Sequence, residues 1–184
     1  MFEAIQVAYW LALSTWFGGV LFIAIAAPII FRTIREADPT LPKVLSVNLE
    51  GQHGTLLAGT IVGNLLTVLS KIELACAGVM LLAIIGQWVY VDRSGIEIVA
   101  PILRSAMYAA AVGLLIYDWR IVWPRIQLFR QQYIDHADEP DIANPARDQF
   151  DRYQNEEMRL LFFQIILLSL MMIFSAVVTP RLIL

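Results

Sequence analysis

The sequence predicts an all-α membrane protein, a bundle of four transmembrane helices, from its composition and from the lengths of its apolar runs. Of its 184 residues, 59% are hydrophobic and 16% are charged, whereas a soluble domain has roughly 45–50% apolar and about 25% charged residues. Four runs approach the roughly 20 apolar residues that a helix needs to cross a bilayer. The runs do not alternate in polarity as the strands of a membrane barrel would.

The predicted spans cover residues 5–31, 72–91, 99–117 and 160–179. Each must be helical, because a backbone group in hydrocarbon needs a hydrogen-bond partner within its own segment. We interpret residues 1–184 as a single four-helix transmembrane domain.

The basic residues predict the orientation of these spans. The loops after the first and third spans, with their flanks, carry ten Lys and Arg residues, and the opposite side carries three. Because the positive-inside rule places basic loops in the cytoplasm, we expect a multi-pass protein of the cell (inner) membrane with both termini outside the cytoplasm.

The second helix is predicted to begin well before its span. Residues 55–69 contain no charge and continue into Lys71 and Glu73 without a turn residue. A helix over residues 55–91 would be about 55 Å long at 1.5 Å per residue, so we expect its first half to project into the cytoplasm. We expect another segment of the protein to pack against its apolar surface there.

The segment of about residues 120–159 is predicted to be a cytoplasmic helical hairpin that packs against this surface. Apolar residues recur at helical spacing along each arm, namely Val122, Ile126, Phe129 and Tyr133, and then Ala146, Phe150, Tyr153 and Leu160 together with Glu157. The third and fourth helices are therefore also expected to extend into the cytoplasm. We expect Pro124 to kink the first arm, and Asn144 and Pro145 to start the second.

Small residues at intervals of three or four predict the seams between spans, because helices in lipid associate through close packing. Packing within the chain is a simpler explanation of these seams than a dimer interface. The glycines expected at the seams are Gly18, Gly19, Gly59, Gly63 and Gly113.

Six charged residues are predicted to form a layer at the cytoplasmic boundary of the spans, namely Lys71, Glu73, Asp118, Arg120, Arg125 and Glu157. An uncompensated charge in hydrocarbon costs at least about 2.5–3.5 kcal/mol. Since Glu157 lies on an otherwise apolar stripe, we expect it to pair with Lys71, Arg120 or Arg125. A structural ion-pair layer or snorkelling is the preferred interpretation, and a proton or substrate site is the alternative.

Sulfur-containing side chains are candidates for a metal site. Cys76 and Met80 lie four residues apart on the second span and Met107 lies on the third, and copper(I) favours thiol and thioether ligands. Such residues in apolar helices usually serve packing, so a copper site is the secondary interpretation. Neither histidine lies on a span, and no cofactor is predicted.

Several residues of the first helix resemble the opening of the transmembrane protein 205-like family, a domain of unknown function. They are Trp16, Gly18, Gly19, Phe22, Pro28 and Phe31. The resemblance implies four helices and no established reaction. The same opening is loosely similar to that of CopD-like copper-resistance membrane domains, which implies metal or small-molecule handling. Where the family usually carries His and then Ser, this chain has Gln154 and Glu157.

The remaining features bear on the class of function. A net charge of -3 argues against nucleic-acid binding, which needs a basic face. The chain has no phosphate-binding loop, dinucleotide fingerprint or nucleophile elbow, so an enzyme is not predicted. The preferred interpretation is a non-catalytic accessory or scaffold subunit that contacts the lipid bilayer and other membrane subunits or a second copy. The alternative is transport or sensing of a small ligand or of a metal such as copper.

Overall fold

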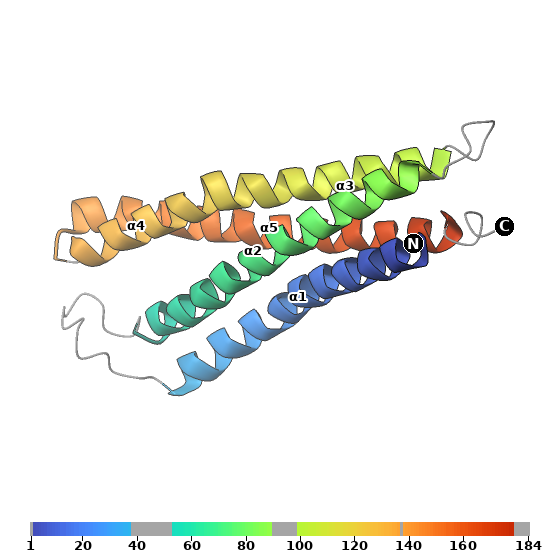
Figure 1. Cartoon of the computed structure of the whole chain (residues 1–184). Coiled ribbons are helices and arrows are strands. Elements are labelled where there is room, and N and C mark those ends of the chain that lie inside the picture. Colours follow the sequence, from blue (N-terminus) through green and yellow to red (C-terminus); the bar gives the residue numbers. More distant parts are fainter. Residues whose placement is uncertain (1, 38–52, 90–98, 137, 179–184) are drawn as a thin grey trace. The chain divides into compact units, whose positions relative to one another are not determined.

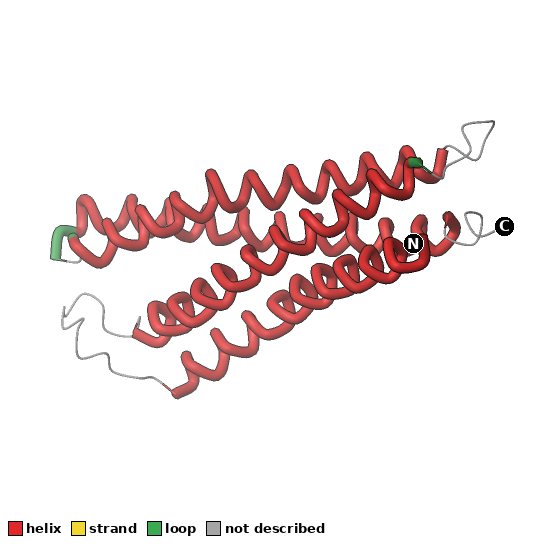
Figure 2. The backbone as a smooth tube through the Cα atoms, viewed as in Figure 1, coloured by secondary structure: helices red, strands yellow, loops and turns green. Residues whose placement is uncertain are grey.

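The described part of the protein consists of helices and a few turn residues. The computed structural model describes residues 2–37, 53–89, 99–136 and 138–178, and no strand occurs among them (Figures 1 and 2). The elements in chain order are α1 (Phe2–Ala37), α2 (His53–Trp88), α3 (Val99–Tyr117), the π-helix η3 (Asp118–Val122), α4 (Trp123–Asp135) and α5 (Pro140–Val178).

Four helical stretches are long and apolar enough to cross a membrane. They are Glu3–Ala37, Leu57–Trp88, Val99–Asp135 and Pro140–Ala176. The prediction of an all-α, multi-pass membrane protein is therefore confirmed. The ends of the second and fourth predicted spans, residues 90–91 and 179, lie outside the described residues.

A π-helical turn precedes the proline that the sequence predicts to bend the third helix. In η3 the backbone N–H of Trp123 donates to the carbonyl of Asp118, five residues earlier. Pro124 has no N–H to continue a regular ladder, and π-turns inside helices are often found at functional sites. The turn therefore makes the vicinity of Asp118 a candidate for a functional site.

The expected start of the fourth helix at Asn144 and Pro145 is wrong, because α5 begins at Pro140 and contains Pro145. The fixed φ of proline suits the first helical position. The carbonyl of Glu139 accepts the N–H groups of Ile142 and Ala143 at 3.0 and 2.9 Å, which secures this earlier start. The cost of Pro145 is limited to the beginning of the helix, where several N–H groups have no partner in any case.

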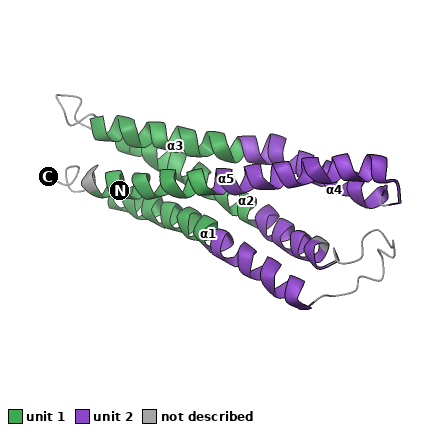
Figure 3. Ribbon diagram, turned by 180° about the vertical axis from the view of Figure 1, so that it is seen from behind, with its two compact units in different colours: residues 1–21, 69–116, 162–184 green, residues 22–68, 117–161 purple. Residues whose placement is uncertain are grey.

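The chain divides into two compact units, each assembled from segments that are distant in sequence (Figure 3). Unit 1 consists of Met1–Leu21, Leu69–Ile116 and Phe162–Leu184. Unit 2 consists of Phe22–Val68 and Tyr117–Leu161. Each unit contains part of α1, α2 and α5, and unit 2 also contains η3 and α4. The interpretation of the chain as one domain stays a prediction.

Unit 1 has a core built on one face of α1. Tyr9, Leu13, Trp16 and Val20 are fully buried there, and their spacing of three or four residues is that of a single helix face. Gly19 allows a close approach, because a Cβ atom at this position would lie 2.7 Å from Cδ1 of Leu69. Gly18 and Gly113 have no such neighbour within 4 Å.

Unit 2 has a core between α2, η3, α4 and α5. The apolar faces of the two arms bury Val122, Ile126, Tyr133 and Ala146. A Cβ atom on Gly63 would lie 3.0 Å from the Trp123 ring, whereas one on Gly59 would meet no atom within 4 Å. The rings of Phe129 and Tyr153 stack with their centroids 5.7 Å apart. Within unit 2, then, both arms of the predicted hairpin contribute to the core.

Candidate functional site

A buried carboxyl group in unit 1 is held by neutral donors. Glu73 is 4% exposed, and its Oε1 accepts hydrogen bonds from Nε1 of Trp16 and Nε2 of Gln164, each at 3.1 Å. Three helices, α1, α2 and α5, therefore meet at this carboxyl. Hydrogen bonds to a charged group contribute about 1.5–3 kcal/mol each, so these donors offset part of the cost of burying it. Lys71, the other charge predicted here, is exposed.

A buried arginine lies in the same unit without an acceptor. Arg104 is 0% exposed, and none of its three guanidinium nitrogens has a hydrogen-bond partner. Its guanidinium lies 5.2 Å from the centre of the Tyr9 ring, and such a cation–π contact is worth up to about 2 kcal/mol when desolvated. The hydroxyl of Tyr9 is hydrogen-bonded to Ser175 at 2.7 Å, which fixes the ring beneath the charge.

Two buried amides add further unmatched polar atoms to unit 1. Nε2 of Gln87 donates to Oε1 of Gln6 at 3.2 Å, while Nε2 of Gln6 and Oε1 of Gln87 have no partner. Gln6 lies one turn before Tyr9 on α1. The sequence prediction missed both amides and counted Arg104 among the basic residues of the outer side. A lone arginine within an apolar run is the feature that could have revealed the arginine.

The sulfur-containing candidates lie in the same unit. Cys76 and Met80 are buried in its core, and Met107 is half-buried. Tyr108 joins α3 to α2 beside Cys76, because its hydroxyl donates to the carbonyl of Ala77 at 2.7 Å. No cluster of three or more His, Cys, Asp or Glu side chains that could hold a metal occurs among the described residues. The copper site stays a prediction.

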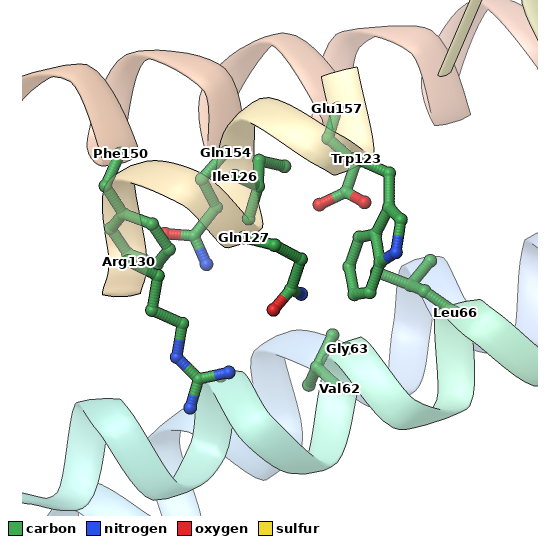
Figure 4. Close-up of a pocket in the computed structure, with 11 residues that line it drawn as sticks. Val62, Gly63, Leu66, Trp123, Ile126, Gln127, Arg130, Phe150, Gln154 and Glu157 are labelled. Carbon is green, nitrogen blue, oxygen red and sulfur yellow. The ribbon is translucent and has the colours of Figure 1, made fainter. Parts of the chain in front are cut away.

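Unit 2 contains a small pocket between α2, α4 and α5 (Figure 4). The space open to the centre of a water molecule is about 20 Å³, and one water molecule needs roughly 10–15 Å³. The pocket therefore accepts one water-sized occupant. It is lined by Gly59, Val62, Gly63, Leu66, Trp123, Ile126, Gln127, Arg130, Phe150, Gln154 and Glu157.

Two carboxyl groups at or beside this pocket have unmatched oxygens. Glu157 is 6% exposed and lines the pocket, and its Oε1 is buried without a hydrogen-bond partner. Oδ1 of the half-buried Asp118 is likewise buried without a partner. The two groups are close enough for like-charge repulsion to act between them.

The two arginines of unit 2 that were expected to pair with Glu157 make other contacts. No ion pair joins Glu157 to Arg120 or Arg125 in the described part of the chain, and Lys71 belongs to unit 1. NH1 of Arg125 donates to the Tyr153 hydroxyl at 2.6 Å, and Arg120 lies over the Trp119 ring. Both arginines are on exposed faces, whereas Glu157 faces the core. The expected pairing fails because the side chains point in different directions.

Arg130, which was not among the predicted site residues, is the cation that lines the pocket. Its NH2 donates to the hydroxyl of Thr60 on α2. In Figure 4 its guanidinium extends from α4 toward α2, and the carboxyl of Glu157 is turned toward Trp123. The pocket thus contains one guanidinium and one buried carboxyl group, with the Asp118 carboxyl close by.

Comparison of the chain with protein-family models, with curated proteins and with solved structures finds no match. The resemblance to the transmembrane protein 205-like family stays a prediction.

Proposed function

We propose that this multi-pass membrane protein is a non-catalytic accessory or scaffold subunit of a membrane complex. In this proposal both termini lie outside the cytoplasm of a cell (inner) membrane, and residues 120–159 form a cytoplasmic docking surface for another membrane protein subunit. The orientation follows from the distribution of basic residues.

The observation that carries the proposal is the exposure of large apolar side chains in unit 2 segments that the sequence predicts to lie outside the hydrocarbon. These side chains are Ile61, Val68, Trp119, Ile121, Leu128, Ile142 and Met158. Exposed apolar surface of this kind is typical of interaction sites when it is contiguous. Within the hairpin, Leu128 is 53% exposed and Ile142 is 45% exposed, and neither is needed to fill the core of unit 2.

Purification of the tagged chain from its native membrane in mild detergent, followed by mass spectrometry, tests this role. We expect other membrane proteins to copurify at fixed stoichiometry. The double variant L128S/I142S should reduce their recovery at least tenfold without lowering the amount of folded protein. Gln131→Ser is the matched control, because Gln131 is an exposed polar residue of the same hairpin. Recovery of the chain alone, or equal recovery of partners by all variants, would contradict the proposal.

A second candidate function is transport or sensing of a small ligand, as the looser resemblance to CopD-like domains also implies. The specific observation in its favour is that ionisable groups are buried without partners, Arg104 in unit 1 and Glu157 in unit 2. Ionisable residues inside membrane helices commonly mark ligand or ion pathways. Metal analysis and an absorption spectrum of the purified protein separate the two candidates, because a bound metal or pigment at unit stoichiometry favours ligand handling.

A further inference from the structure

The unit 2 pocket has the size of a site for a single ion rather than for an organic molecule. The space open to a water centre is about 20 Å³. A drug-sized ligand needs a cavity of roughly 300–1,000 Å³. Trp123, Ile126, Leu66 and Phe150 form apolar walls, so an occupant would be held by the few polar groups among them.

The polar groups at the pocket are suited to a cation. Oε1 of Glu157 is buried and has no hydrogen-bond partner. The side-chain amides of Gln127 and Gln154 also line the pocket, and amide and carboxylate oxygens are the ligands that hard cations prefer. In Figure 4 the amide of Gln127 projects into the space between α4 and α2.

The charges around the pocket decide which cation fits. Glu157 and Asp118, when ionised, contribute two negative charges, and Arg130 contributes one positive charge. The sum is one uncompensated negative charge. A divalent cation would overcompensate it and would be repelled by Arg130. Magnesium would in addition keep several of its waters, for which the pocket has no room.

We propose that the unit 2 pocket binds a single monovalent cation, either a proton or an alkali-metal ion, with Glu157 as its principal ligand and Asp118 as the second negative charge. The bound cation compensates the carboxyl group that the basic residues of unit 2 leave unpaired. The proposed cation site does not depend on the proposed subunit role, because all the groups that form it belong to unit 2.

The test measures thermal unfolding of the purified full chain in detergent. One series replaces choline chloride with sodium chloride at constant pH and ionic strength, and a second series raises the pH in choline chloride. An alkali ion at a hundred times its dissociation constant lowers the unfolding equilibrium constant about 100-fold, so the wild type should gain stability with sodium. If the cation is a proton, sodium should have no effect and the wild type should lose stability as the pH rises.

The variant Glu157→Gln removes the principal ligand and should abolish whichever dependence the wild type shows. Asp151→Asn is the matched control, because Asp151 is an exposed acid on the same helix, and it should retain that dependence. Equal sodium and pH dependences in the wild type and in E157Q would overturn the proposal.

A measurement on the wild type alone covers the case in which E157Q does not fold. Infrared difference spectra report a protonated, buried carboxyl group through its C=O stretch. We expect either this band, lost on raising the pH, or a sodium-induced change in the carboxylate bands. A wild type with neither band responding to pH or to sodium would overturn the proposal.

Discussion

The two units solve the problem of a buried carboxyl group in different ways. In unit 1, Glu73 is held by an indole and an amide from two other helices. In unit 2, Glu157 is equally buried but its Oε1 has no donor. The cations show the reverse pattern, because Arg130 of unit 2 bonds to Thr60, whereas Arg104 of unit 1 has no acceptor.

This difference shows that burial alone does not reveal which charge needs a ligand. A buried polar group is stable when neighbouring elements supply its hydrogen bonds, and it is costly when they do not. Glu73 accepts hydrogen bonds from Trp16 and Gln164, whereas Oε1 of Glu157 lies in a pocket with largely apolar walls and accepts none. Unit 2 therefore has an acceptor without a donor at Glu157, and unit 1 has donors without an acceptor at Arg104.

The largest effect is expected from removing the donors that distinguish Glu73 from Glu157. The double variant W16F/Q164L should lower the free energy of unfolding by about 3–6 kcal/mol, since each bond to a charged group contributes about 1.5–3 kcal/mol. Chemical denaturation in detergent measures this loss. Trp119→Phe is the control, because Trp119 is half exposed. A loss below about 1 kcal/mol would show that Glu73 does not depend on these donors, and the contrast between the units would disappear.

A smaller effect of opposite sign is expected at Arg104. Burying a charge is costly when no hydrogen bond compensates it, and the Arg104 guanidinium has no acceptor, so Arg104→Met should raise the unfolding midpoint. Arg32→Met is the control, since Arg32 is an exposed arginine. Strong destabilisation by R104M would mean that the guanidinium has an acceptor after all.

The smallest effect sharpens the comparison of packing along α2. Alanine is favoured over glycine in a helix by about 0.5–1 kcal/mol. Gly59→Ala should realise this gain, because no atom lies within 4 Å of the added Cβ, whereas Gly63→Ala would meet the Trp123 ring at 3.0 Å. We expect G63A to be less stable than G59A by about 1 kcal/mol. Equal midpoints for the two variants would show that the ring moves aside without cost.

Parts of the candidate sites could be predicted from the sequence, and parts could not. Glu157 attracts attention because it interrupts an apolar stripe, and Asp118 because it follows an apolar span. The partner expected for Glu157 was misjudged, since sequence separation does not show which way Arg120 and Arg125 point. The start of α5 was misplaced for a similar reason, because Pro140 and Pro145 both suit a first turn and only the bonds to Glu139 distinguish them.

The sequence by itself determined the class of the protein and its four long helices. Length and hydropathy are properties of single segments, and an apolar segment of sufficient length in lipid has no stable form other than a helix. Only the tertiary structure decided that Glu73 is satisfied and that Arg104 and Glu157 are not. That outcome depends on donors and acceptors from other helices, and their positions are fixed by packing rather than by local sequence.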